Sequence, residues 1–259
     1  MSQNYNNFNY NNNDNSVRQK QNFTNDINDM SAAFADADAR MGFITKTYLY
    51  VIGSIFALIG IEFVLLSSVD GTALVSLMMG SRFSWIVVLL LFMGVSTLAN
   101  VWANSSTSPL IQHLGLGLYI VAQSIILLPL LWLAQRVDAS GGLITSAAIA
   151  TGGLFSLMTV AVFLTRADFS FLRTALFFGG FALLGAIAFS MLFGMSLGPI
   201  LMYFGIALAC GYILYDTSNV LHHYRTSQHV AAALALFASV VFLFWYVLQL
   251  FLTIFGNND

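Results

Sequence analysis

The residue in this chain best suited to chemistry is Asp216, a carboxylic acid inside a long apolar stretch. Between Thr174 and Asn258 the only other charged residue is Arg225. A carboxylate inside a hydrophobic span costs about 2.5–3.5 kcal/mol on insertion scales, so such residues are rare and usually face the interior of a helix bundle. A carboxyl group in a low-dielectric interior favours its neutral form. Asp216 is therefore a candidate for proton or ion sensing.

Two stripes of small side chains predict that another helix packs against the helix of Asp216. On its own helix, Asp216 shares one face with Gly205, Ala209 and Tyr212, and Asn219 continues that face. The next span carries a matching stripe of residues, in chain order Ala231, Ala235, Ser239, Phe242, Tyr246 and Gln249. Small residues at intervals of four let helices approach closely. We therefore expect Asp216 to face protein rather than lipid.

The depth of Ser239 matches that of Asp216. The hairpin between their two spans centres near Ser227, eleven residues after Asp216 and twelve before Ser239. At about 1.5 Å of rise per residue, the two depths agree to within roughly one helical turn. We expect the Ser239 hydroxyl to hydrogen-bond Asp216, and we predict a site for ion or proton sensing that consists of Asp216, Ser239 and Asn219. The alternative is that Ser239 serves only as a small packing residue.

The composition identifies an integral membrane protein. Hydrophobic residues make up 58% of the chain and charged residues 8%, against about 25% charged in an ordinary soluble domain. The uncharged runs 83–135, 139–165, 174–215 and 226–258 each exceed the roughly 20 residues that a helix needs to cross a bilayer. Because the apolar residues are continuous rather than alternating, helices are favoured over the strands of an outer-membrane barrel.

We predict an all-α fold with a seven-helix transmembrane domain over residues 47–255. The spans are expected near 47–68, 84–103, 113–135, 143–165, 173–194, 198–221 and 231–255. Eleven asparagines fall within the first 28 residues, so residues 1–30 are expected to form a disordered tail. Apolar residues at helical spacing predict a short interfacial helix over 31–46.

The distribution of Lys and Arg predicts an N-terminus in the cytoplasm. With that orientation seven of the nine Lys and Arg residues lie on the inner side, and only Arg82 and Arg136 lie on the outer side. Seven spans then place the C-terminus outside. Glu62, near the outer end of the first span, is expected to snorkel to the interface or to line an outer vestibule.

Several classes of function are disfavoured by the sequence. A net charge of −2 offers no basic surface for nucleic acid, and Cys210, as the only cysteine, excludes an internal disulfide. Zinc hydrolysis needs histidines deep in the spans, but His222, His223 and His229 fall at the last hairpin. Intramembrane proteolysis needs a paired base or a second aspartate. We expect no catalysis, no metal and no cofactor.

Three segments resemble the C-terminal motif of the Bax inhibitor family, the transmembrane Bax-inhibitor-motif proteins. They are GYILYDTSN at 211–219, HYRT at 223–226 and AAALALF at 231–237. The resemblance extends over residues 40–255 in layout. It implies a seven-helix fold with the last helix central. For characterised members it also implies a pH-sensitive calcium leak governed by two aspartates, one in each of the last two helices.

The chain departs from that pattern at the second aspartate. The first acid matches Asp216, but the second position falls at Ser239, within LFASVV at 236–241. Two close carboxylates share a proton because they resist joint ionisation, and one carboxylate with a serine cannot do this. The serine variant resembles the bacterial branch whose known member modulates a membrane-anchored AAA protease. TRADFSFL at 165–172 resembles that branch as well.

Two functions remain open from the sequence. The first is a regulator of, or interactor with, a membrane protease in the bacterial inner membrane, with the lipid bilayer and an AAA protease as partners. The second is a pH-sensitive leak for calcium or other cations that uses Asp216. Ser239 argues against the second function because it removes one acid of the pair.

Overall fold

A computed structural model describes residues 31–68, 73, 76, 80–105, 108–194 and 198–256 of the 259-residue chain. The predicted tail over residues 1–30 lies outside this part. The described residues form seven α-helices: α2 (Ala37–Ser68), α4 (Arg82–Ala103), α5 (Pro109–Val137), α6 (Gly142–Thr165), α7 (Leu172–Phe193), α8 (Gly198–His222) and α9 (His229–Phe255).

All seven of these helices are long and apolar enough to cross a membrane. The predicted all-α membrane fold is therefore confirmed, and the protein is a multi-pass membrane protein. The structure differs from the sequence interpretation at its start, because α2 is continuous from Ala37 to Ser68. Residues 37–46 extend the first span as its opening turns and do not form a helix of their own.

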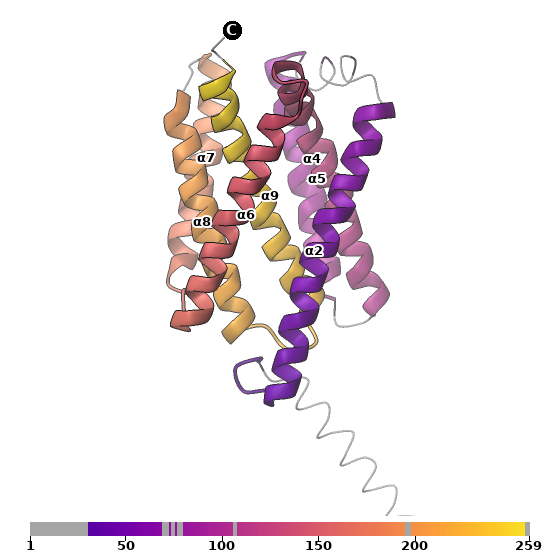
Figure 1. Cartoon of the computed structure of the whole chain (residues 1–259), viewed down its shortest axis with the longest axis vertical. Helices are drawn as coiled ribbons and strands as arrows, with labels where there is room; N and C mark the ends of the chain where they lie inside the picture. Colours follow the sequence, from indigo (N-terminus) through magenta and orange to yellow (C-terminus); the bar gives the residue numbers. More distant parts are fainter. Residues whose placement is uncertain are drawn as a thin grey trace, which may run out of the picture.

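Helix α9 occupies the centre of the bundle (Figure 1). It packs against α2, α4, α5, α6 and α8. Within the most apolar 18-residue stretch of α9, 72% of the residues are buried, whereas only 11% are buried in the corresponding stretch of α4 and of α7. A helix that is apolar on all sides is stable only where neighbouring helices or lipid surround it. The prediction of a central last helix is confirmed.

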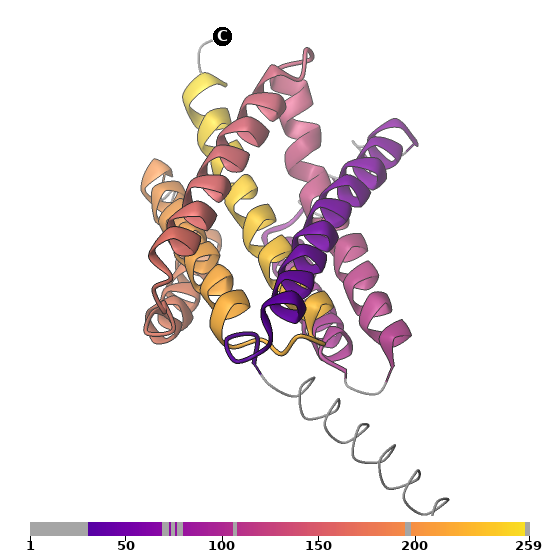
Figure 2. The ribbon, with the colours of Figure 1, turned by 60° about the horizontal axis from the view of Figure 1, so that its bottom comes forward.

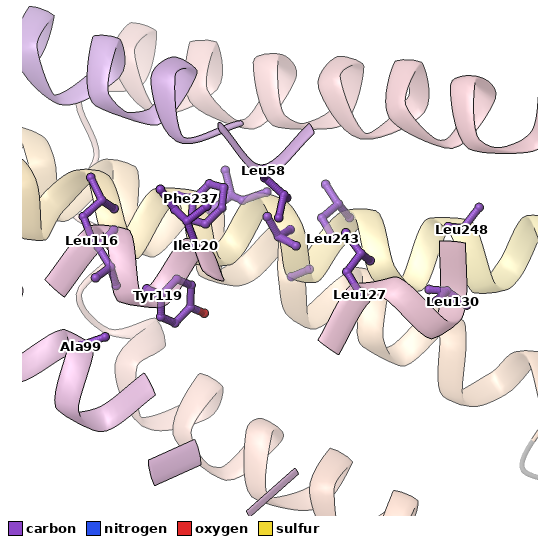
Figure 3. Packing of buried hydrophobic residues seen from close by; sticks show 14 of the residues in the cluster. Leu58, Ala99, Leu116, Tyr119, Ile120, Leu127, Leu130, Phe237, Leu243 and Leu248 are labelled. Carbon is purple, nitrogen blue, oxygen red and sulfur yellow. The ribbon is translucent and has the colours of Figure 1, made fainter. Parts of the chain in front are cut away.

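The main core forms where α5 and α9 face each other and α2 covers them (Figure 3). Tyr119 of α5 and Phe237 of α9 meet edge to face, with ring centroids 6.1 Å apart. Leu58 of α2 belongs to the same buried cluster as Leu127 and Leu243. Since lipid is as apolar as these side chains, such close packing, rather than the exclusion of water, holds the helices together.

One end of the bundle carries the start of α2 and the connections α4–α5, α6–α7 and α8–α9 (Figure 2). We call this the N-terminal end. Here the backbone N–H of Ala32 donates to the carbonyl oxygen of Tyr224 at 2.8 Å, and Ser31 pairs with Arg225 in an isolated antiparallel bridge. Residues 31–36 are thereby held against the α8–α9 hairpin.

Candidate functional site

The site centres on a buried hydrogen bond between α8 and α9. The Ser239 hydroxyl donates to Oδ2 of Asp216, and the two oxygen atoms lie 2.5 Å apart. Asp216 is 8% exposed and Ser239 is 6% exposed. The structure thus brings together the two residues that the depth match predicts to be neighbours. Their role in proton or ion sensing remains a prediction.

Small residues allow α8 and α9 to approach closely enough for this bond. A Cβ built on Gly205 would collide with the ring of Tyr246 on α9, so a larger residue there would displace the ring. Ala209 and Ala231 are buried, with exposures of 0% and 3%. Side chains that end at the Cβ leave the two backbones near each other, as in other small-residue helix pairs.

Tyrosine side chains from three parts of the chain surround Asp216. Tyr119 on α5, Tyr212 on α8 and Tyr224 in the α8–α9 hairpin all lie within electrostatic range of its carboxyl group. Burial raises the pKa of the Tyr224 hydroxyl, and a negative charge on Asp216 raises it further. Like Ser239, each of these three neighbours presents a hydroxyl group, and none of them carries a positive charge.

A cavity of about 320 Å³ opens beside the hydrogen-bonded pair, between α5, α7, α8 and α9. Its polar lining comes from Ser239, Tyr119, Tyr212 and Tyr246, and its apolar lining includes Leu183 and Leu208. The Tyr212 hydroxyl donates to the carbonyl oxygen of Leu176 at 3.0 Å, which fixes that side chain against α7. Ser239 therefore faces both Asp216 and an unfilled volume in the bundle.

Asp216 is also linked to the N-terminal end through Ser218. The Ser218 hydroxyl accepts a hydrogen bond from the backbone N–H of Phe169 at 2.9 Å, which holds the α6–α7 loop against α8. In the same loop the backbone N–H of Ser170 donates to Asp168 and holds the pKa of that carboxyl below its ordinary value. His223 Nε2 lies 3.7 Å from the Asp168 carboxylate. Asp216 is thus two residues along α8 from the contact that Ser218 makes with the α6–α7 loop.

We call the surface formed by residues 31–36, 166–171 and 223–228 the loop face. These three segments hold one another by the bonds from Ala32 to Tyr224 and between Asp168 and His223. A movement of α8 at Asp216 would therefore displace residues of the loop face. The contact between Asp168 and His223 joins residues of two separate loops, so it could not be predicted from the sequence.

Asn219, the third residue predicted for the site, lies at the end of α8 and is half-buried. Its backbone carbonyl accepts bonds from the N–H groups of His223 and Tyr224, at 2.8 and 2.9 Å. The residue therefore shapes the turn that leads out of the helix. Its participation in sensing stays a prediction.

The structure corrects the interpretation of Glu62. This residue is only 5% exposed, and both of its carboxyl oxygens are buried without a hydrogen-bond partner in the described part of the chain. The snorkelling interpretation is wrong, because α2 presents Glu62 on the same inward face as Leu58 and continues to Ser68. Its position near the end of an apolar run suggests an interface, and only the packing of α2 reveals the burial.

Comparisons with known proteins agree with this architecture. A family model described as "Inhibitor of apoptosis-promoting Bax1" matches residues 40–257. An uncharacterized protein of Pseudomonas aeruginosa is 31% identical over 171 residues, which cover 66% of this chain and 72% of that protein. Bax inhibitor 1 of Schizosaccharomyces pombe is 29% identical over 134 residues, or 46% of each chain.

A plant relative shows a similar partial match. Protein LIFEGUARD 4 of Arabidopsis thaliana is 35% identical over 119 residues, which cover 43% of this chain and 47% of that protein. The chain therefore spans about half the length of the yeast and plant relatives in these matches, and more of the bacterial one.

Proposed function

The chain belongs to the Bax inhibitor family, whose model matches residues 40–257, and from this premise we propose that it is a non-catalytic regulator of another membrane protein. The proposed partner is a membrane-anchored AAA protease of the bacterial inner membrane. The chain binds this partner at its loop face, and the protonation of Asp216 sets the strength of binding.

The observation that carries this proposal is the neutral partner of Asp216. A calcium ion takes six to eight oxygen ligands, most often with several carboxylates among them. Here one carboxyl group meets one hydroxyl, and in the described part of the chain no three His, Cys, Asp or Glu side chains come together as a metal site. The pair suits a group that gains and loses a proton better than one that passes a cation.

The protonation state of Asp216 can affect the loop face through the packing of α8. The charged and the neutral forms of the acid differ in the strength of the hydrogen bond that they accept from Ser239 and in their desolvation cost. Protonation of Asp216 would therefore change how tightly α8 packs against α9. Ser218 on α8 holds the α6–α7 loop at Phe169, so that packing also positions the residues that a partner would contact.

A second function is favoured by a separate observation. Ser239, the hydrogen-bond partner of Asp216, lines a cavity of about 320 Å³, which could form part of a cation path. A pH-sensitive calcium leak therefore remains the alternative proposal. Proteoliposome flux, described in the Discussion, separates the two.

We also propose that the loop face lies in the cytoplasm, since most of the Lys and Arg residues fall on its side. Single cysteines at Ser170, in the α6–α7 loop, and at Ser140, in the α5–α6 loop, test this orientation in a Cys210→Ala background. Both serines are exposed. In intact cells, an impermeant thiol reagent should label the Ser140→Cys variant and spare the Ser170→Cys variant until the membrane is opened. Labelling of both from outside would contradict the seven-span topology.

Affinity capture tests the proposed partner. We expect the tagged parent, solubilised in mild detergent, to enrich a membrane-anchored AAA protease over an unrelated seven-span bait. Asp168→Asn combined with His223→Gln removes the contact between these two side chains of the loop face and should lower the recovery several-fold. Arg136→Gln, a charge change at the opposite end of α5, is the matched control and should leave recovery unchanged. Recovery no higher than with the unrelated bait would refute the protease proposal.

A further inference from the structure

A groove of about 420 Å³ runs between α2 and α5. Its walls are formed by Leu49, Gly53, Ser54, Leu116, Gly117 and Ile120. A Cβ built on Gly53 or on Gly117 would meet no atom within 4 Å, so the groove is open at both glycines. The Ser54 hydroxyl donates to the carbonyl of Tyr50 at 2.7 Å, which leaves the groove apolar.

The end of this groove toward the loop face is polar and ordered. The Tyr50 hydroxyl and Nε2 of His113 lie 2.6 Å apart, and Nδ1 of His113 lies 2.5 Å from the carbonyl oxygen of Pro109. A carbonyl can only accept, so Nδ1 carries the hydrogen, and Nε2 of a neutral His113 accepts from Tyr50. The rings of His113 and His229 both lie 5.4 Å from the ring of Tyr50, centroid to centroid.

This polar end is also positively charged. Lys46 precedes Tyr50 by one helical turn and is exposed. His229 lies within electrostatic range of both Lys46 and His113. In the part of the chain that the structure describes, Lys46 forms no ion pair with a carboxylate. One permanent cation therefore lies one helical turn from Tyr50, and two imidazoles lie beside the Tyr50 ring, at the polar end of the groove.

We propose that the α2–α5 groove binds an anionic phospholipid. The phosphate lies at Lys46, Tyr50, His113 and His229, and one acyl chain follows the groove over Gly53 and Gly117. Both walls belong to membrane-spanning helices, so the groove faces acyl chains and its mouth lies at headgroup level. Cations placed there attract anionic lipids, and Tyr and His at this depth present an apolar body with a polar tip. The cationic end and the apolar walls of the groove thus favour a single ligand that has both an anionic headgroup and an acyl chain.

Such a lipid would touch the regulated part of the molecule. His229 is the first residue of α9 and follows the α8–α9 hairpin directly. A phosphate at His229 would therefore tie the lipid to the loop face, independently of Asp216. The lipid composition of the membrane would then affect the loop face in addition to the protonation of Asp216.

Native mass spectrometry of the detergent-purified full chain tests the site. The probes are phosphatidylglycerol and phosphatidylcholine with the same acyl chains. We expect phosphatidylglycerol to bind the parent more tightly than phosphatidylcholine does. Lys46→Gln should weaken phosphatidylglycerol binding roughly five-fold, the effect of one cation near a charged membrane surface. The matched control, Arg136→Gln at the other end of α5, should not change it.

A second pair of variants tests the acyl-chain half of the groove. Gly53→Leu should fill the groove and weaken the binding of both lipids, whereas Gly94→Leu, at an equally open glycine of α4, should weaken neither. Excess inorganic phosphate should fail to displace phosphatidylglycerol. Equal affinity of the parent for the two lipids, unchanged binding to Lys46→Gln or Gly53→Leu, or displacement by inorganic phosphate would each overturn the proposal.

Discussion

Replacing Ser239 by aspartate is expected to create a calcium leak that grows several-fold as the pH rises from mildly acidic to alkaline. The new carboxyl group would take the position from which the Ser239 hydroxyl reaches Asp216 at 2.5 Å, and the adjoining cavity has room for it. The two acids can share one proton at low pH. When that proton leaves, two charges about 4 Å apart repel by about 4 kcal/mol at an effective dielectric constant of 20, which drives α8 and α9 apart and offers two carboxylates to a cation.

Two controls separate charge from shape in this experiment. Ser239→Asn has nearly the same volume as Ser239→Asp but no charge, and it should leak no more than the parent. Asp216→Asn added to Ser239→Asp restores a single acid and should abolish the pH dependence of the leak. If Ser239→Asp leaks no more than the parent at any pH, a second carboxylate at this position does not open a cation path, and the ion-conduction alternative should be abandoned.

Replacing Ser239 by alanine is expected to lower the free energy of unfolding by about 1–3 kcal/mol, because a buried acceptor loses its hydrogen-bond donor. Asp216 is only 8% exposed, so water cannot easily replace the hydroxyl. Thermal unfolding in a mild detergent, followed by circular dichroism, measures the change. The loss should be smaller in an Asp216→Asn background, since the two groups act on each other.

Ser124→Ala provides a matched comparison. Ser124 is as deeply buried as Ser239, but its hydroxyl donates to the backbone carbonyl of Val121 within its own helix. That carbonyl belongs to the regular helix, so its loss of one donor should cost less. Equal losses for Ser124→Ala and Ser239→Ala would show that the bond to Asp216 has no special weight in the stability of the bundle.

The sequence was sufficient to predict the number of spans and the central pair of the site. Long uncharged runs leave few alternatives to transmembrane helices, and the run from Thr174 to Tyr215 ends at the acid itself. Asp216 and Ser239 lie on two helices joined by a short hairpin, so their relative depth follows from the rise per residue. Local geometry therefore predicts the partner of the acid.

Features that depend on packing between distant segments could not be predicted. The position of Tyr119 beside Phe237 depends on α5 meeting α9, two helices about a hundred residues apart. The docking of Phe169 on Ser218 is likewise a contact across 49 residues. Glu62 shows the same limit, because hydropathy places it near a membrane interface and only the orientation of α2 buries it. Periodicity indicates which face of a helix is polar, but not what covers it.

The most decisive measurement is calcium flux into proteoliposomes that contain the unaltered chain, at mildly acidic and at alkaline pH. We expect flux no greater than that of protein-free liposomes at both values, because Asp216 is paired with the hydroxyl of Ser239 and not with a second carboxylate. A calcium ionophore, added at the end of each run, shows that the assay detects a leak. A calcium leak through the parent that changes with pH and disappears in Asp216→Asn would contradict the proposed regulatory function and establish the chain as a proton-gated cation path.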